Sequence, residues 1–393
     1  MPMLTPEFRI SAQKYVLALL IILLIPLLSY GIWLFYPSYQ LNILVIDKSV
    51  PNTNYQEHKS IFWVLEHNKF ISSKGDFYKK DQDYYGFFPD SSDGHGVVKD
   101  INKLTDSEMK KRVFEADVVF LADTYGVYEN NFNNGSREKI SKKIYGGLDR
   151  SDIRMLREAV AQEKTVIAEF NSMASPTPKA IRAEFENLMG MKWTGWISRY
   201  FDEMDTLINN DIPKWFIRQY RIQHKKEWVS PGPGLIFVRD DGKVEALAFQ
   251  THYLNQIPLI RTQKNNKLGF NLPEIVPYPD WFDIVMIERE YEVISYYDID
   301  PTPEGLQKLK EMGLPRFFPA AVSKKNGRGK LYYFAGDFSD LRGDLGSARL
   351  TGLPFLWRGF HVVTDYTDRQ SFFWNYYYPL TTKIFKNISE GKE

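Results

Sequence analysis

The sequence predicts an α/β fold, a doubly wound and mostly parallel sheet, preceded by one transmembrane helix. Three short apolar runs have the length of buried strands, at residues 41–47, 116–123 and 165–170. Between them lie segments with apolar residues at helical spacing, at residues 54–70 and 151–164. Wholly apolar strands that alternate with amphipathic helices are typical of a parallel sheet covered on both faces.

The first element is an apolar stretch at residues 15–36, and no charged residue lies between Lys14 and Asp47. At about 1.5 Å per residue, this stretch crosses the roughly 30 Å hydrocarbon core of a bilayer as a helix. A signal peptide is the competing interpretation, but its apolar region is usually about 7–15 residues long and ends in an A-x-A-like site, which is missing here. Because Arg9 and Lys14 precede the helix, we expect a cytoplasmic N-terminus and an extracytoplasmic main domain. An interfacial aromatic belt is expected at Tyr30, Trp33 and Tyr36.

The middle of the chain carries clear start and stop signals. Residues 71–100 are polar and rich in turn residues, which indicates an elaborated loop around one weak strand. A Thr-x-x-Glu box at Thr105 predicts a helix that leads into the strand at residues 116–123. The helix at residues 151–164 and the strand at residues 165–170 follow as the next unit.

A β-richer region interrupts this alternation after about residue 200. Residues 234–249 contain an Asp-Gly pair between two apolar runs, which is a strong signal for a hairpin. Farther on, Thr302, Pro303 and Gly313 predict the start and end of another helix. The expected organisation is a cytoplasmic tail at 1–14, a transmembrane helix at 15–36, the first part of the α/β domain at 37–200, a β-rich insertion or subdomain at 201–300, and the closing part of the domain with an aromatic C-terminal segment at 301–393.

Composition excludes several kinds of chemistry. The chain has 50 basic and 49 acidic residues, so no strong positive field favours nucleic acid as a partner. It has no cysteine, which excludes disulfides, thiolate catalysis and cysteine-ligated metals. The six histidines form no pair at ligand spacing, and residues 90–96, DSSDGHG, are interpreted as a solvated loop. We therefore expect no metal and no cofactor.

Two stretches carry a resemblance to a known family. They are GGLDRSDIRMLREAVAQEKTVIAEF at residues 146–170 and GRGKLYYFAGDFSD at residues 327–340. Together they resemble the class I glutamine amidotransferase-like (flavodoxin-like) superfamily, in particular its extracytoplasmic branch. The resemblance implies a nucleophilic cysteine in the turn at residues 169–172 and a His-x-Glu pair downstream. This chain has neither, so the resemblance implies a domain that has lost amidotransferase catalysis.

Ligands of open parallel sheets bind beyond the carboxyl ends of the strands, so the residues there are the candidates for a site. Four expected strands end in carboxylates, namely Asp47, Asp123, Glu169 and Asp337. Other polar candidates nearby are His58, Thr124, Tyr125, Asn171 and Ser172. A shared acidic pocket would supply an acid and a base, with Glu169 and Asp337 as the candidate catalytic pair. The alternative is that these residues only cap helices and make turns.

These observations leave three hypotheses for function. The leading one is a membrane-anchored extracytoplasmic binding or accessory protein of the cell envelope, in polysaccharide assembly or export, rather than an enzyme. The second is an envelope glycan hydrolase or lyase that uses the strand-end carboxylates. The third is a structural subunit that docks a membrane-embedded enzyme or transporter. Aromatic clusters at residues 193–201 and 371–380 could stack on carbohydrate, or they could fill a core.

Overall fold

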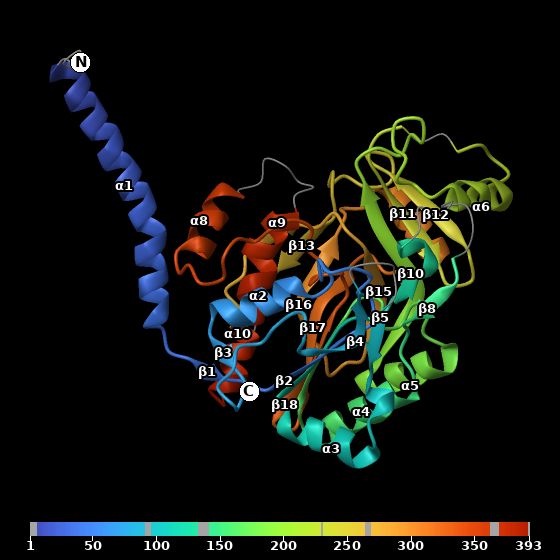
Figure 1. Ribbon diagram of the computed structural model, residues 1–393. Helices are drawn as coiled ribbons and strands as arrows, with labels where there is room; N and C mark the ends of the chain where they lie inside the picture. Colours follow the sequence, from blue (N-terminus) through green and yellow to red (C-terminus); the bar gives the residue numbers. More distant parts are fainter. Residues whose placement is uncertain are drawn as a thin grey trace.

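The computed structural model of the chain describes residues 6–90, 96–132, 141–228, 231–263, 269–361 and 369–391. A ten-stranded sheet runs through the main domain, and a four-stranded sheet lies beside it (Figure 1). The spatial order of the large sheet is β14 (Ile275–Pro277), β13 (Leu259–Thr262), β16 (Glu292–Asp298), β17 (Phe318–Asn326), β18 (Gly329–Phe334), β9 (Thr165–Glu169), β6 (Val118–Asp123), β2 (Ile43–Asp47), β4 (Tyr84–Pro89) and β5 (Gly96–Lys99). The small sheet has the order β12 (Val244–Ala248), β11 (Gly234–Arg239), β10 (Met191–Phe201) and β15 (Phe282–Ile287). Two short pairs join β1 (Tyr39–Gln40) to β3 (Phe70–Ile71), and β7 (Val127–Tyr128) to β8 (Lys143–Tyr145).

The large sheet is mixed, so the prediction of a doubly wound parallel sheet is wrong. Among the described strands, the four parallel pairs run from β18 through β9, β6 and β2 to β4. The other five pairs of this sheet are antiparallel. All three pairs of the small sheet are antiparallel as well. The alternation of helices and strands therefore describes only the centre of the large sheet.

The type of connection explains this difference. Parallel neighbours need a long crossover, whereas a tight turn can join only antiparallel strands. β11 and β12 are joined through Asp241 and Gly242, and β17 and β18 are joined through Gly327 and Arg328. The strands within residues 201–300 are divided between the sheets, because β11, β12 and β15 belong to the small one and β13, β14 and β16 extend the large one.

Helices cover the parallel centre from both sides. In Figure 1, α2 and α10 lie on one side of the large sheet, and α3, α4 and α5 lie on the other. The helices are α1 (Pro6–Leu34), α2 (Lys59–His67), α3 (Asp106–Glu115), α4 (Arg150–Ala161), α5 (Lys179–Met189), α6 (Lys214–His224), α7 (Pro303–Met312), α8 (Leu353–Phe360), α9 (Arg369–Phe372) and α10 (Tyr378–Ser389). Single turns of 3₁₀-helix lie at Ile101–Lys103 and Glu129–Asn131, and a π-helical turn at Phe373–Tyr377 joins α9 to α10.

The predicted helix boundaries are confirmed where a capping signal was present. Thr105 accepts a hydrogen bond from the Glu108 amide at 3.3 Å, and its own amide donates to Glu108 Oε2 at 2.8 Å. Thr302 likewise accepts from the amide of Gly305 at 3.1 Å at the start of α7. α7 ends at Gly313, whose φ of +75° is the left-handed conformation that favours glycine.

Both aromatic clusters contribute to the core. In the segment at residues 371–380, the buried rings are those of Phe372, Phe373, Trp374, Tyr376 and Tyr377. In the segment at residues 193–201, the buried rings are those of Trp196, Tyr200 and Phe201. These side chains pack within the domain, and Tyr200 and Phe201 also line a cavity.

The N-terminal helix α1 stands out from the domain (Figure 1). Its part from Lys14 to Leu34 is long and apolar enough to cross a membrane, and only 6% of the most apolar window is buried. A signal sequence meets the same criterion. The base of α1 contacts the domain, where the Trp33 indole N–H donates to His67 O at 3.0 Å and Lys69 Nζ donates to Leu34 O at 2.9 Å. Trp33 is 3% exposed, so the domain covers this residue of the expected aromatic belt.

Candidate functional site

Four parallel strands that neighbour one another, β18, β9, β6 and β2, end at the same edge of the large sheet. Asp47, Asp123 and Glu169 are the last residues of β2, β6 and β9, and Asp337 follows the end of β18 by three residues. The fold therefore brings all four predicted carboxylates to one edge. All four side chains are buried.

Asp47 forms a buried pair with His58, the residue that precedes α2. His58 Nδ1 lies 2.6 Å from Asp47 Oδ2, and His58 Nε2 lies 2.8 Å from the Lys80 carbonyl oxygen. Both ring nitrogens thus lie within hydrogen-bond distance of an oxygen atom. The second oxygen of Asp47 accepts from the Ser49 amide at 2.8 Å. Every polar group of this pair is therefore engaged within the fold.

Asp123 and Glu57 are two further carboxyl groups beside this pair. Asp123 Oδ1 accepts from the Tyr125 amide at 2.6 Å. Burial, followed by the charge of Asp47, raises the pKa of Asp123 to about 7. The same two causes raise the pKa of Glu57 well above its usual range. Asp123 and Glu57 therefore hold a proton to higher pH than ordinary carboxyl groups do.

Glu169, the candidate catalytic residue in the turn, is bound by two groups that are distant in sequence. Its Oε1 accepts from the Tyr377 hydroxyl at 2.8 Å, and its Oε2 accepts from the Ser339 amide at 2.8 Å. The residue is 0% exposed, and burial raises its pKa to about 8. Glu169 thus ties β9 to the loop after β18 and to the C-terminal helical segment.

Asp337 belongs to a second cluster, which surrounds Arg369. The Asp337 carbonyl oxygen accepts from the guanidinium of Arg369. The same guanidinium donates to Asp280 Oδ2 at 2.8 Å and lies 3.9 Å from Asp340 Oδ2. Burial, followed by the charge of Asp340, raises the pKa of Asp337 well above its usual range.

The other predicted binding residues mostly build the turn. Thr124 Oγ1 donates to the Asn171 carbonyl at 2.9 Å, and Ser172 Oγ donates to the Glu169 carbonyl at 2.8 Å. Asn171 has a φ of +67°, a conformation that asparagine tolerates better than most residues. Tyr125 differs from the others because its side chain is 49% exposed.

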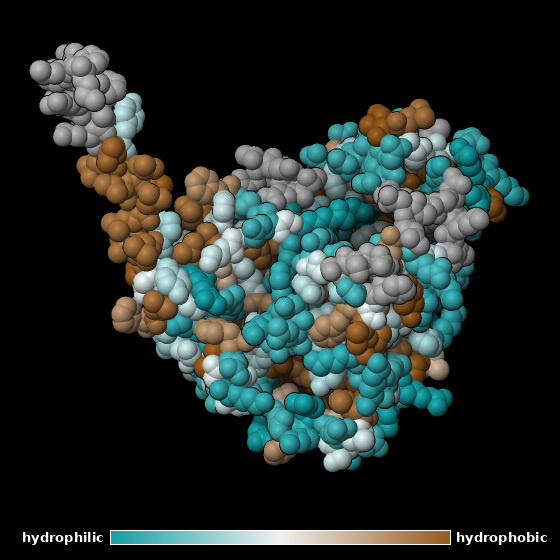
Figure 2. Space-filling view, in the orientation of Figure 1, coloured by the Kyte–Doolittle hydropathy of each residue, from teal (hydrophilic) through white to brown (hydrophobic). Residues whose placement is uncertain are grey.

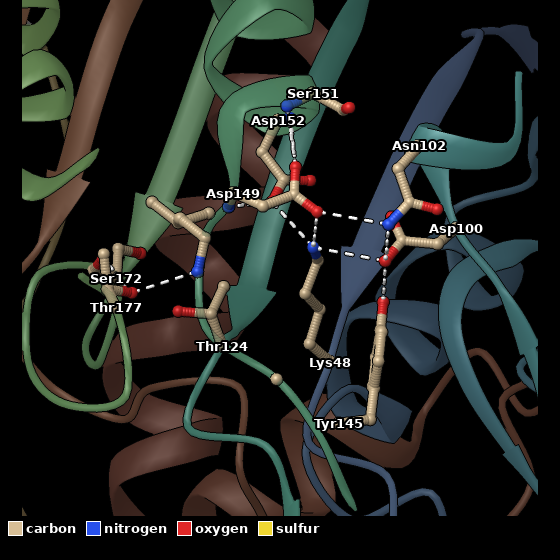
Figure 3. A network of polar contacts seen from close by, with 12 residues as sticks. Lys48, Asp100, Asn102, Thr124, Tyr145, Asp149, Ser151, Asp152, Ser172 and Thr177 are labelled. Carbon is tan, nitrogen blue, oxygen red and sulfur yellow. Dashed lines mark hydrogen bonds and ion pairs between the residues drawn. The ribbon is translucent and has the colours of Figure 1, made fainter. Parts of the chain in front are cut away.

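A buried lysine network lies at the same edge (Figure 3). Lys48 Nζ lies 2.6 Å from Asp152 Oδ2, 3.3 Å from Asp100 Oδ2 and 3.7 Å from Asp149 Oδ2. The Tyr145 hydroxyl donates to Asp100 Oδ2 at 2.5 Å. Lys48 follows the last residue of β2, whereas Asp149 and Asp152 stand at the start of α4, so the network joins the strand to the helix.

One ammonium group, that of Lys48, lies close to three carboxylates in this network. Burial opposes the charged form of Lys48, but the charges of Asp152, Asp100 and Asp149 outweigh it and raise the pKa of the lysine. Burial also raises the pKa of Asp152 to about 7, despite the contact with Lys48. The network therefore keeps the ammonium charged at neutral pH.

Two cavities open beside these clusters. One, of about 300 Å³, is lined by Lys48, Asp100, Tyr145 and Asp149 together with the Gly146-Gly147 turn. The other, of about 400 Å³, lies between the end of β10, the residues just before β15 and the segments around Arg342 and Arg369. Its lining residues are Arg199, Tyr200, Phe201, Asp202, Asn209, Asp211, Pro279, Asp280, Arg342, Arg369 and Gln370. Both volumes lie in or near the range of small-molecule sites.

No group of three or more His, Asp or Glu side chains in the described part of the chain is placed to hold a metal ion. The segment DSSDGHG, predicted as a solvated loop, lies largely outside the described ranges, at residues 91–95.

Several residues of the site are absent from the sequence-based prediction. The position of Lys48 could have been predicted, because a charged residue directly after a buried strand lies at the carboxyl edge of the sheet. No sequence pattern indicated the other three residues, Arg369, Ser339 and Tyr377, since they reach the edge from loops and from the C-terminal segment. Only tertiary structure places them there.

Comparisons with known proteins place this chain in no family. No protein-family model and no curated protein sequence matches it. Among solved structures, a ThuA-like protein from Bacteroides uniformis is similar at 10% identity and a TM-score of 0.38, over 86% of this chain and 97% of that one. A β-galactosidase from Bacillus circulans has 11% identity and a TM-score of 0.33, over 77% of this chain and 30% of that one. An exo-β-1,4-mannosidase from an Opitutaceae bacterium has 10% identity and a TM-score of 0.29, over 87% of this chain and 36% of that one. These scores are too low to assign a fold family or a function.

Proposed function

We propose that the chain is a single-pass, membrane-anchored accessory protein of the cell envelope. Its main domain lies outside the cytoplasm and binds a carbohydrate ligand in polysaccharide assembly or export. The single observation that carries this proposal is the isolated apolar helix α1, whose membrane-spanning window is only 6% buried by the domain. A helix that the protein leaves uncovered over about 30 Å needs a bilayer to cover it. The positions of Arg9 and Lys14 support a cytoplasmic N-terminus.

Binding rather than catalysis is supported by the state of the strand-end carboxylates. Asp47 and Glu169 are fully buried and accept hydrogen bonds from groups of the fold itself. A catalytic acid or base must come within hydrogen-bond reach of the substrate. These two residues instead hold strands, helices and loops together. This arrangement agrees with the proposed descent from an amidotransferase-like domain that has lost its nucleophile.

The larger cavity is the proposed ligand site. At about 400 Å³ it has room for a sugar unit, and its walls carry guanidinium, carboxylate and amide groups that can bond to hydroxyls. Arg342 is exposed at this cavity, whereas Arg369 is fixed by Asp280. Arg342 can therefore be changed without disturbing a buried ion pair.

The test is binding of envelope polysaccharide fractions by the purified full-length chain in nanodiscs, measured by calorimetry. We expect Arg342→Ala to weaken binding by roughly 10–100-fold, the effect of one hydrogen bond to a charged group. Arg316→Ala, which removes another exposed arginine outside the cavity, serves as the matched control. No binding by the unchanged chain, or equal affinity in both variants, would refute the carbohydrate site.

A glycan hydrolase or lyase is the second candidate function. The observation in its favour is Asp123, whose pKa of about 7 suits an acid or base at neutral pH. The same polysaccharide fractions distinguish the two functions. Release of new chain ends that stops in Asp123→Asn would establish the enzyme, whereas binding without cleavage supports the accessory protein.

A further inference from the structure

The short helix α8 presents an apolar face that the domain does not cover. Leu353 and Trp357, one turn apart, pack against the core of the domain. Three other apolar side chains of α8 extend into solvent, since Phe355 is 87% exposed, Phe360 is 71% exposed and Leu356 is 49% exposed. Large apolar side chains on a helix are normally covered by a partner.

The position of α8 indicates what covers this face. The residues just before it contact α1, since Thr351 Oγ1 lies 3.4 Å from Ser29 Oγ and the Gly352 amide donates to the same oxygen at 3.4 Å. Figure 1 shows α8 beside the half of α1 that is nearer the domain, and Figure 2 shows hydrophobic surface along α1. The exposed apolar face of α8 therefore continues the apolar surface of α1.

The depth of α8 follows from helix geometry. Ser29 lies five residues before Leu34, the last residue of α1, which places the start of α8 roughly 7.5 Å inward from the end of that helix. An amphipathic helix at a membrane surface is buried about 5–10 Å into the boundary between headgroups and acyl chains. A bilayer that covers Lys14–Leu34 therefore reaches the face formed by Phe355, Leu356 and Phe360.

We propose that α8 is a second membrane contact, an interfacial helix that inserts its Phe355, Leu356 and Phe360 side chains into the leaflet on the domain side of the bilayer spanned by α1. The proposal rests on the membrane anchor of the proposed function. Together with the contacts of Trp33 and Lys69 at the base of α1, it fixes the domain against the membrane surface.

The experiment uses the absence of cysteine in the natural chain. Single Phe355→Cys, Phe360→Cys, Leu23→Cys and Phe114→Cys variants of the full-length chain are spin-labelled and placed one copy per nanodisc of phosphatidylcholine and phosphatidylglycerol. Leu23 lies in α1, and Phe114 is an exposed aromatic residue of α3, on a part of the domain away from α8 in Figure 1. Collision with oxygen and with a water-soluble nickel complex gives the depth of each label.

We expect the labels at Phe355 and Phe360 to lie about 5–10 Å below the phosphates, the label at Leu23 to lie deeper, and the label at Phe114 to remain in water. A buried Leu23 label with aqueous labels at both α8 positions would refute the interfacial helix and leave the anchor standing. An aqueous Leu23 label would refute the anchor as well. Because each disc holds one copy, shielding of α8 by a second copy cannot produce the expected result.

Discussion

Glu169 provides the sharpest test of how the acidic edge is built. It is fully buried, and its two oxygens accept from the Tyr377 hydroxyl and the Ser339 amide. Burial raises its pKa to about 8, so the folded chain keeps this carboxyl group neutral at pH 7. The Glu169→Gln variant has the shape of the neutral acid, since its amide oxygen can accept from Ser339 and its amide N–H₂ can donate to Tyr377.

The pH dependence of stability gives the magnitude. A raised folded pKa means that Glu169 contributes its full stability below its ordinary pKa of about 4.5 and loses it as the pH rises to about 8. At 1.36 kcal/mol per pH unit, this window corresponds to about 5 kcal/mol. Glu169→Gln does not titrate, so it should match the wild type near pH 4.5 and exceed its stability by about 5 kcal/mol above pH 8.

The assay is thermal unfolding of the full-length chain in detergent, followed by tryptophan fluorescence between pH 4.5 and pH 9. The variant should unfold roughly 6 °C above the wild type at high pH, and the difference should vanish at the acidic end. Glu311→Gln, at an exposed position on α7, is the matched control and should follow the wild type at every pH. A difference between Glu169→Gln and the wild type that stays constant with pH would refute the account of a neutral buried acid.

Two further predictions concern the lysine network and the topology. Lys48→Met should lower the free energy of unfolding by about 3–5 kcal/mol at neutral pH, because it leaves the buried Asp100 and Asp152 without their cation, and acid should reduce the loss as the carboxylates take up protons. Exposed Lys110→Met is its control in the same unfolding assay, and equal stability of the two variants would contradict a buried ion cluster. A reporter enzyme fused after Glu393 should be active only outside the cytoplasm, because positive charge precedes α1, and cytoplasmic activity of this fusion would overturn the proposed location.

The sequence by itself determined the elements whose formation depends on interactions between residues close together in the chain. The uncharged run after Lys14 predicted α1, because the length and apolarity of a spanning helix are properties of the segment alone. The Thr105 box and the Thr302 cap set the starts of α3 and α7, since each cap closes within one turn of its helix. The order of chain segments likewise placed Asp47, Asp123 and Glu169 at one edge.

Tertiary structure alone decided the sheet and the partners of the site. An apolar run predicts a strand but not its neighbour, because parallel and antiparallel pairing satisfy the same backbone groups. The large sheet is therefore mixed, although its strands were visible in the sequence. In the same way, Glu169 was visible as a strand-end carboxylate, but Tyr377 lies 208 residues farther along the chain. Burial and hydrogen bonding across that separation make Glu169 a fixed, neutral contact, and no local pattern encodes an interaction of this range.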